Sequence, residues 1–269
     1  MLGDMNANSV NSSPNPGHGL LAGKVAFISG AGRGIGAAAA RLFAEEGAQV
    51  LLTARTEEQL SAVAEEVRGG GGTAEYVVCD LADPAAVRSA VQHTVDTFGR
   101  LDVAFNNGAT ITPPNALDEV PEEEFDTLYA VNLKSVWVAI AAEVAAIRQS
   151  VGTGAIVNNS SVGSLRGNPV LPAYGAMKRA VNSLTETAAV TYGPEGIRVN
   201  AIAPGNTDTE MIQSWETHTP GLSERLAANT PLRRGAEPRE IAEAAAWLLS
   251  DRSSFVTGTV LPVDGGARA

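Results

Sequence analysis

A tyrosine and a lysine four residues apart, Tyr174 and Lys178, are the side chains whose types and spacing most directly suggest acid–base chemistry. In a helix, a spacing of four places both on one face. A lysine cation about 6 Å away, at an effective dielectric constant of about 20, favours a phenolate by roughly 3 kcal/mol. That energy lowers the tyrosine pKa from about 10 by about two units. We therefore expect Tyr174 to act as a general acid or base near neutral pH.

Two serines precede this pair in the sequence. The apolar segment 155–159 predicts a strand, and Ser160 and Ser161 follow it directly. In parallel sheets, ligands bind at the carboxyl ends of the strands. We expect Ser161 to hydrogen-bond a substrate carbonyl beside Tyr174, with Ser160 as its nearest competitor.

An asparagine, Asn132, lies in the middle of a long predicted helix, 122–149. Asparagine disfavours helix interiors slightly, which invites a functional interpretation. The alternative is a packed amide at a helix kink.

A glycine-rich turn follows the first predicted strand, 24–29, and opens a helix. The turn contains, in order, Ser29, Gly30, Ala31, Gly32, Arg33, Gly34, Ile35 and Gly36. Glycines let the backbone approach a pyrophosphate closely, and the helix start supplies free N–H groups. A strand before it and a helix after it are the context that a dinucleotide-binding turn requires.

The residue at the end of the second predicted strand indicates which nicotinamide cofactor binds. An NAD site needs a carboxylate there for the ribose 2′-hydroxyl. The chain has Ala54 at this position, followed by Arg55, and Arg33 projects from the glycine turn. Two guanidinium groups suit a 2′-phosphate. We therefore expect NADP(H) rather than NAD(H).

Strands and helices alternate along the rest of the chain. Strands are predicted at 24–29, 48–54, 74–79, 101–106, 155–159, 196–203 and 258–263. Helices are predicted at 35–46, 56–68, 84–98, 122–149, 173–192 and 238–250. This alternation predicts an α/β fold, a single doubly wound, Rossmann-type parallel sheet of seven strands with helices on both faces. We expect residues 1–20 to form a disordered tail, 21–269 one catalytic domain, and the irregular, polar stretch 206–232 a substrate lid.

Composition excludes several other classes of protein. The 269-residue chain has a formal net charge of -11, which argues against a nucleic-acid binder. No apolar run approaches the roughly 18 residues of a membrane span, and we expect no secretory signal. Cys79 is the only cysteine, and the three histidines lack metal-ligand spacing. We expect a cytoplasmic protein that binds no metal, membrane or nucleic acid.

Together these motifs resemble the classical short-chain dehydrogenase/reductase family over about residues 22–268. The catalytic tetrad of that family is matched by Asn132, Ser161, Tyr174 and Lys178. Ser161 is preferred to Ser160 because it lies thirteen residues before Tyr174, as in the family. Asn106-Asn107-Gly108-Ala109 resembles the family's Asn-Asn-Ala-Gly element with its last two residues exchanged, and 263–266 resembles its C-terminal ending. By this resemblance, the cofactor contacts are Ser29, Gly30, Arg33, Gly34, Ile35, Gly36, Arg55, Asp80, Leu81, Asn107, Gly108, Tyr174, Lys178, Pro204, Gly205, Thr207 and Thr209.

The resemblance implies an oxidoreductase that transfers hydride between the nicotinamide and a carbonyl or secondary alcohol. It implies that Tyr174 transfers the proton, Ser161 holds the oxygen, Lys178 binds the nicotinamide ribose, and Asn132 supports Lys178 through an ordered water. It also implies a homotetramer, or a homodimer, built on the helices 122–149 and 173–192.

The substrate is predicted only as a small apolar or bulky carbonyl compound. The expected pocket residues are Ile111, Leu165, Val170, Met211 and Trp215. Two alternatives remain. One is a 3-oxoacyl-carrier-protein reductase, which the acidic net charge disfavours. The other is a catalytically inactive nucleotide-binding sensor or scaffold, which the complete Ser161, Tyr174 and Lys178 set disfavours.

Overall fold

Seven parallel strands form one sheet in the computed structural model, which describes residues 19–269. The strands are β1 (Val25–Ser29), β2 (Gln49–Ala54), β3 (Thr73–Val78), β4 (Val103–Asn106), β5 (Gly154–Asn159), β6 (Ile197–Pro204) and β7 (Val260–Val263). Their order is β3-β2-β1-β4-β5-β6-β7, so the winding direction reverses between β1 and β4. The predicted doubly wound parallel sheet is confirmed.

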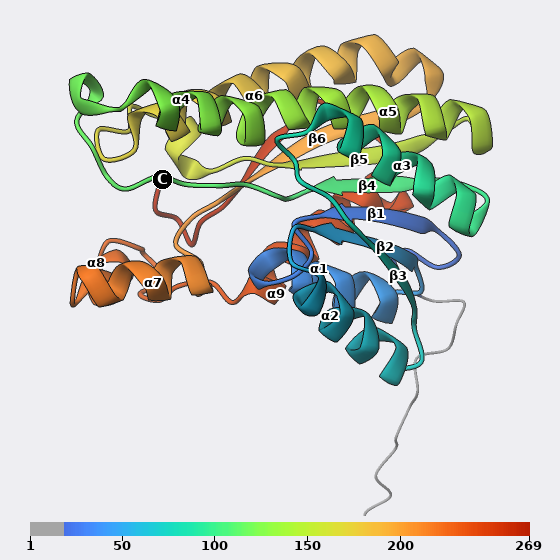
Figure 1. Cartoon of the computed structure of the whole chain (residues 1–269), viewed down its shortest axis with the longest axis horizontal. Coiled ribbons are helices and arrows are strands. Elements are labelled where there is room, and N and C mark those ends of the chain that lie inside the picture. Colours follow the sequence, from blue (N-terminus) through green and yellow to red (C-terminus); the bar gives the residue numbers. More distant parts are fainter. Residues whose placement is uncertain (1–18) are drawn as a thin grey trace, which may run out of the picture.

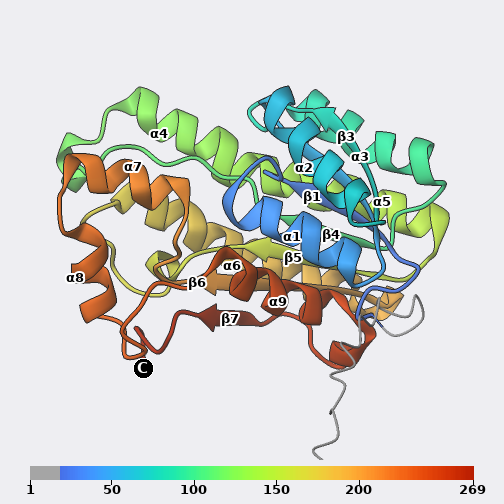
Figure 2. The ribbon, with the colours of Figure 1, turned by 90° about the horizontal axis from the view of Figure 1, so that it is seen from below.

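Helices cover both faces of this sheet (Figures 1 and 2). On one face lie α1 (Gly34–Glu45), α2 (Glu57–Gly69) and α9 (Pro238–Leu249), and on the other α3 (Pro84–Phe98), α5 (Ser135–Ser150) and α6 (Pro172–Tyr192). The remaining helices, α4 (Glu122–Tyr129), α7 (Glu210–His218) and α8 (Leu222–Ala228), lie beyond the carboxyl ends of the strands.

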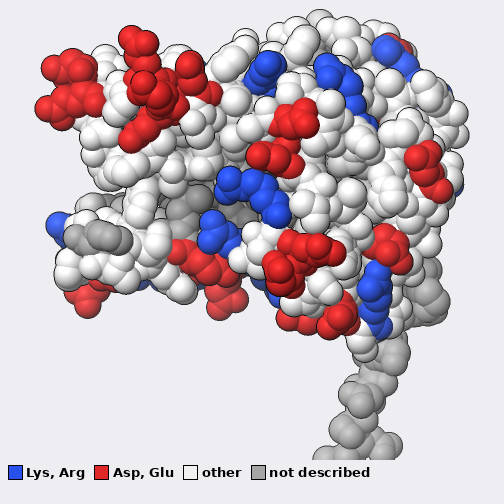
Figure 3. All heavy atoms as spheres, in the orientation of Figure 1, with Lys and Arg blue, Asp and Glu red and all other residues white. Residues whose placement is uncertain are grey.

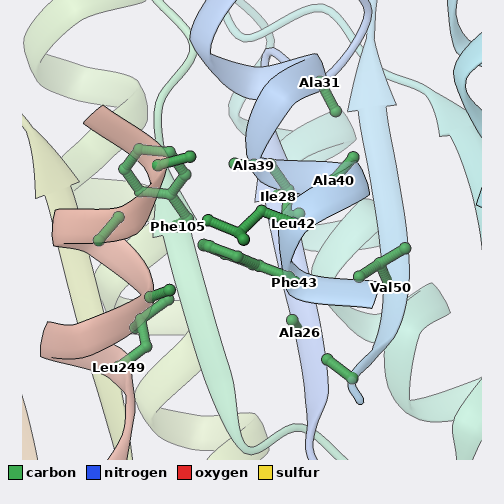
Figure 4. Packing of buried hydrophobic residues seen from close by; sticks show 14 of the residues in the cluster. Ala26, Ile28, Ala31, Ala39, Ala40, Leu42, Phe43, Val50, Phe105 and Leu249 are labelled. Carbon is green, nitrogen blue, oxygen red and sulfur yellow. The ribbon is translucent and has the colours of Figure 1, made fainter. Parts of the chain in front are cut away.

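The strands are apolar because helices bury them from both sides. All five residues of β1 are buried. Figure 4 shows the packing of α1 and α9 on this part of the sheet, with Leu42, Phe43 and Leu249 against Ile28 and Phe105. The rings of Phe43 and Phe105 lie 6.0 Å apart, a tilted contact that ties α1 to β4. This packing holds the strand ends, and with them the site, in fixed positions.

Leu20 and Leu21, at the predicted boundary between tail and domain, are held in the fold. Leu21 is fully buried, and the Leu20 N–H donates to the Glu46 carboxylate at 2.5 Å. Residues 1–18 of the predicted tail lie outside the described residues.

The predicted helix 122–149 is interrupted. A π-helical turn, Ala130–Lys134, separates α4 from α5 and contains the fully buried Asn132. Its side-chain amide donates to the Thr110 carbonyl and accepts from the Thr110 N–H, both at 2.8 Å. A π-turn inserts one extra residue into the helical ladder. The interruption therefore turns the Asn132 side chain to the loop that follows β4.

The stretch 206–232 was predicted to be irregular, and this was wrong. It forms α7 and α8, joined by a tight turn with Gly221 at a φ of 77°. The Glu216 carboxylate accepts hydrogen bonds from the N–H groups of Gly221 and Ser223, at 2.6 and 2.7 Å, and from the Ser223 hydroxyl. These bonds cap the start of α8 and lower the pKa of Glu216. The cap comes from a side chain in the preceding helix, so local sequence signals did not reveal it.

One helical segment, Glu122–Ser150, is long enough and apolar enough to cross a membrane, with a mean hydropathy of 1.5 over its best 18-residue window. In the fold, 56% of that window is buried, where α5 packs on α3 and the sheet. A core helix that packs on a sheet can be as long and as apolar as this segment.

A buried polar network joins the carboxyl ends of β4 and β5 to the helices behind them. The Asn106 amide donates to Glu143 of α5 and to Asn158 of β5, both at 3.0 Å, and Asn158 donates to Thr185 of α6 at 2.9 Å. Glu143 is fully buried, and its second carboxyl oxygen has no hydrogen-bond partner among the described residues. Burial raises the pKa of Glu143 to about 8, against a smaller lowering by the Asn106 amide.

The buried carboxyl predicts a pH-dependent stability. A carboxyl whose folded pKa lies above its unfolded value binds a proton on folding, so the free energy of unfolding falls as pH rises from about 4.5 to about 8. Glu143→Gln removes this dependence. We expect the variant to unfold with the wild-type midpoint at pH 5 and to be more stable by about 3 kcal/mol at pH 8.

Thermal unfolding at the two pH values measures the effect. The exposed Glu65→Gln on α2 serves as the matched control, and its unfolding should follow the wild type at both pH values. A Glu143→Gln variant that parallels the wild type from pH 5 to pH 8 would contradict the predicted protonation.

Candidate active site

A cavity of about 380 Å³ opens at the carboxyl ends of β1, β2, β4, β5 and β6. It brings together most of the predicted site. The predicted residues that line it are Gly30, Arg33, Gly34, Ile35, Arg55, Asp80, Leu81, Asn107, Gly108, Ser161, Tyr174, Lys178, Pro204, Gly205, Thr207 and Thr209. This is the position at which doubly wound sheets bind ligands, beside the point where the winding reverses.

Close backbone contacts shape the glycine turn at one end of the cavity. Gly30 adopts a φ of 67°, and a Cβ there would lie 2.5 Å from the Gly108 Cα. A Cβ on Gly36 would lie 2.0 Å from the Gly30 carbonyl oxygen. No larger side chain fits at either position. Gly36 therefore shapes the turn without itself lining the cavity.

The turn is tied to the loop after β4. The Ser29 hydroxyl accepts from the Gly108 N–H at 3.1 Å, and the Asn107 amide donates to the carbonyls of Ser29 and Gly30 at 3.2 and 3.1 Å. A Cβ on Gly108 would meet the Leu81 side chain at 2.4 Å. In the exchanged order, glycine stands at position 108, where a Cβ would collide with Leu81.

Two arginines flank the cavity where β2 ends. Arg33 and Arg55 are exposed and line it beside Ala54, and within residues 19–269 neither forms an ion pair. No carboxylate stands at position 54. Figure 3 shows Lys and Arg side chains gathered at the hollow in this face of the molecule. The free guanidinium groups fit an anionic group such as a 2′-phosphate.

At the other end lie the predicted proton-transfer residues. The Ser161 hydroxyl is hydrogen-bonded to Tyr174, and it also accepts from the Gly163 N–H at 3.1 Å. The Lys178 ammonium lies 5.7 Å from the centre of the Tyr174 ring and donates to the Asn159 carbonyl at 2.7 Å. Tyr174 and Lys178 lie on one face of α6, as their spacing predicts.

The neighbouring serine is held elsewhere. The Ser160 hydroxyl donates to Asn182 at 2.6 Å and contacts the Lys178 carbonyl and the Ser164 hydroxyl. The side chain is buried in this cluster, so its hydroxyl is committed to the protein. Between the two serines, the geometry favours Ser161 as the one available to a substrate.

The electrostatics of the pair differ from the prediction. Burial raises the pKa of Tyr174 to about 12, and the hydrogen bond from Ser161 offsets only part of that rise. Burial also lowers the pKa of Lys178 to about 8. The prediction counted the lysine charge and omitted desolvation, which disfavours both the phenolate and the ammonium. Tyr174 is therefore firmly protonated at neutral pH, the form that donates a proton.

Asn132 does not reach the cavity. Its neighbour Val131 and its hydrogen-bond partner Thr110 both line the wall, while its amide is committed to the Thr110 backbone. Among the described residues, no hydrogen bond joins Asn132 to Lys178 or Tyr174. The amide is packed at a helix interruption, where it holds the cavity wall, and the predicted support of Lys178 through an ordered water stays a prediction.

The predicted substrate residues are not confirmed as part of this cavity. Among the described side chains, Ile111, Leu165, Val170 and Trp215 do not line the cavity, and Val170 is 54% exposed. The side chain of Met211 lies outside the described part of the chain. The next residue of α7, Ile212, does line the cavity. A helix at 210–218 was not predicted, so no sequence signal indicated which side of this segment faces inward.

Several other lining residues were not among the predicted contacts, although Gly32, Ala54, Ala109 and Ser160 stand in the motifs or strand ends that the sequence indicated. They are Gly32, Ala54, Thr56, Gln59, Cys79, Ala109, Thr110, Val131, Asn159, Ser160, Glu210 and Ile212. Most follow directly after a strand or neighbour a predicted residue. Their backbone position, rather than a motif, places them on the wall.

A doubly wound sheet with a glycine turn at the end of its first strand is the arrangement that dinucleotide-binding proteins use. Comparison with known proteins agrees. The family described as Enoyl-(Acyl carrier protein) reductase matches residues 30–268. The A-factor type gamma-butyrolactone 1'-reductase (1S-forming) of Streptomyces virginiae is 48% identical over 251 residues, which cover 92% of this chain and 96% of the relative.

Other relatives and solved structures agree with this assignment. Cyclohexanol dehydrogenase of an Acinetobacter species is 37% identical over 242 residues, which cover 90% of this chain and 94% of that enzyme. The crystal structure of levodione reductase superposes with a TM-score of 0.86 at 36% identity, and the match covers 90% of this chain and 96% of that one. The chain belongs to the classical short-chain dehydrogenase/reductase family and is an oxidoreductase.

Proposed function

We propose that this protein is an NADP(H)-dependent oxidoreductase that interconverts a ketone or aldehyde and the corresponding alcohol. One observation carries the proposal. Ser161, Tyr174 and Lys178 line the same cavity as the glycine turn and the two unpaired arginines. A dinucleotide along this cavity would bring its nicotinamide to the tyrosine while its phosphates lie at the other end.

The residues that would hold the cofactor follow from the geometry. The N-terminus of α1 and the glycine turn would bind the pyrophosphate, Arg33 and Arg55 the 2′-phosphate, and Lys178 the nicotinamide ribose. When bound, NADPH supplies the hydride. A Cβ on Gly30 or Gly36 would collide with neighbouring backbone, so only glycine allows the turn that presents these N–H groups.

The chain's own residues would move and hold the proton. Ser161 would hold the substrate oxygen, and Tyr174 would donate its hydroxyl proton to it. The raised pKa of Tyr174 suits this donor role and the direction of carbonyl reduction. Asn132 would act as a positioning residue that fixes Thr110 on the wall. The α7–α8 pair, which carries Ile212, would close over the substrate as the lid.

The names of the relatives support a substrate class. They include a gamma-butyrolactone reductase, a cyclohexanol dehydrogenase and a cyclohexadiene-diol dehydrogenase. Each of these names includes a cyclic compound. We propose a small carbonyl compound that carries its ketone on or beside a ring, against the apolar wall of Val131 and Ile212.

The alternative substrate is an acyl group on a carrier protein. Acidic side chains, among them Asp118, Glu119 and Glu122–Glu124, gather at the start of α4, beside the hollow (Figure 3). An acidic carrier would meet like charge there. This surface favours a free small molecule.

A homotetramer and a cytoplasmic location remain parts of the proposal. Exposed apolar side chains on the two expected interface helices, Trp137 of α5 at 56% and Val190 of α6 at 80%, support an assembly through them.

Arg55 tests the choice of cofactor. Arg55→Ala removes a charge-assisted contact with the 2′-phosphate, and we expect kcat/KM for NADPH to fall by about 10- to 100-fold. The value for NADH, which lacks that phosphate, should stay within about 2-fold because neither the pocket nor the catalytic residues change. Steady-state rates with one ketone and each cofactor measure the ratio.

Arg88→Ala is the matched control, because Arg88 is exposed on α3 and does not line the cavity. Within residues 19–269, the one hydrogen bond of its side chain is to the Pro84 carbonyl. If Arg55→Ala lowered kcat/KM equally for NADPH and NADH, the proposed contact between Arg55 and the 2′-phosphate would be wrong.

A further inference from the structure

Asn159 is a lining residue that the proposed proton transfer does not use. It is the last residue of β5, immediately before the two serines, and its side chain is 9% exposed. Its backbone carbonyl accepts a hydrogen bond from the Lys178 ammonium, and its side chain is hydrogen-bonded to Asn107. The residue therefore stands between the glycine turn and the proton-transfer pair.

The orientation of its side-chain amide follows from its neighbours. The NH₂ group of Asn107 donates to two carbonyls, those of Ser29 and Gly30, which can only accept. The Asn107 oxygen must then face Asn159. The Asn159 NH₂ group donates to that oxygen at 2.9 Å. Rotating the Asn107 amide by 180° would place its oxygen against the two carbonyl oxygens. Rotating the Asn159 amide would place its oxygen against that of Asn107.

This orientation leaves one acceptor without a donor. The Asn159 Oδ1 atom is buried and has no hydrogen-bond partner among the described residues. A buried acceptor left unsatisfied costs about 1–3 kcal/mol. An apolar side chain at this position would avoid that cost, so a partner supplied by a bound molecule accounts for the asparagine.

The position of Asn159 identifies the part of the ligand. It is linked through Asn107 to the turn that would bind the pyrophosphate, and through its carbonyl to Lys178 beside Tyr174. In a nicotinamide dinucleotide, the group between the pyrophosphate and the nicotinamide is a ribose, whose hydroxyls are donors. Resting on the proposed function, we propose that the Asn159 side-chain oxygen accepts a hydrogen bond from the nicotinamide-side ribose and so helps to position it.

Binding of two ligands tests the proposal without turnover. NADP⁺ contains the ribose in question, whereas 2′,5′-ADP contains only the adenosine half and its phosphates. We expect Asn159→Leu to raise the Kd for NADP⁺ about 10-fold and to change the Kd for 2′,5′-ADP by less than about 3-fold. Isothermal titration calorimetry measures both dissociation constants.

Asn107→Leu is the matched control, because it makes the same substitution at the residue to which the Asn159 side chain is hydrogen-bonded. It removes the bonds to the glycine turn, so we expect both ligands to bind more weakly. If Asn159→Leu weakened both ligands equally, or neither, the proposed ribose contact would be wrong. If the wild-type chain bound neither ligand, the proposed function itself would fail.

A measurement on the wild type covers the case in which the variants do not fold. Thermal unfolding without ligand establishes whether they do. NADP⁺ analogues that lack one hydroxyl of the nicotinamide-side ribose should then bind the wild-type chain several-fold more weakly than NADP⁺. Equal affinity of every such analogue would overturn the proposal.

Discussion

Tyr174→Phe is expected to lower kcat for carbonyl reduction by about 100- to 10,000-fold, the range that a positioned general acid contributes. Phenylalanine keeps the ring and removes the hydroxyl that is hydrogen-bonded to Ser161. Because the loss affects the chemical step, the Kd for NADP⁺ should change by only a few-fold. Single-turnover rates and cofactor titrations separate the two effects.

Tyr192→Phe provides the control for this substitution. Tyr192 is the last residue of α6, with the Arg148 guanidinium 5.2 Å from its ring, and does not line the cavity. Its variant should keep wild-type turnover. Turnover of Tyr174→Phe within about 3-fold of the wild type would show that another group donates the proton.

Gly36→Ala is expected to have the largest effect on stability. The added Cβ would lie 2.0 Å from the Gly30 carbonyl oxygen and 2.6 Å from the Asn107 amide nitrogen. Backbone atoms cannot move aside as a flexible side chain can, so we expect a loss of about 3 kcal/mol in the free energy of unfolding. Because the glycine turn must shift, NADP⁺ binding should be lost as well.

Gly69→Ala is the matched control, because Gly69 ends α2 and a Cβ there meets nothing within 4 Å. Alanine is the better helix former, so this variant should be as stable as the wild type or slightly more stable. Urea unfolding compares the two. A Gly36→Ala protein that unfolds at the wild-type midpoint and binds NADP⁺ would contradict the tight packing of the turn.

The sheet was predictable because its signals are local. The strands are short apolar runs that both faces bury, and glycine turns or capped helices separate them. Tyr174, Lys178 and the glycine turn were found because their spacing is fixed by one helix or one turn. The strand ends then fixed which of these elements meet at the cavity.

The substrate wall depends on tertiary contacts that no spacing reveals. The α7–α8 pair owes its form to the Glu216 carboxylate, which caps a helix that begins six residues later. Asn132 turns to Thr110 because of one π-turn, which a helical pattern cannot distinguish from regular helix. The side of α7 that faces the cavity, and with it Ile212, follows from these contacts.

The pKa of Tyr174 was predicted in the wrong direction for a related reason. The spacing of Tyr174 and Lys178 gives the distance between two charges, but not the water that burial removes. In the structure, burial of the phenol raises its pKa, and the hydrogen bond with Ser161 offsets only part of that rise. The unpaired oxygen of Asn159 is likewise visible only after the partners of its neighbours are known.

The most direct test of the central claim is to follow the absorbance of NADPH and of NADH at about 340 nm. The two cofactors are compared in parallel with one panel of ring-bearing ketones. The account predicts ketone-dependent oxidation of NADPH with a kcat/KM at least about 10-fold above that for NADH, since the two arginines and Ala54 favour the 2′-phosphate. A preference for NADH would contradict the cofactor assignment. Binding of NADPH with no oxidation of it by any ketone or aldehyde would contradict the proposed reaction and favour a nucleotide-binding sensor.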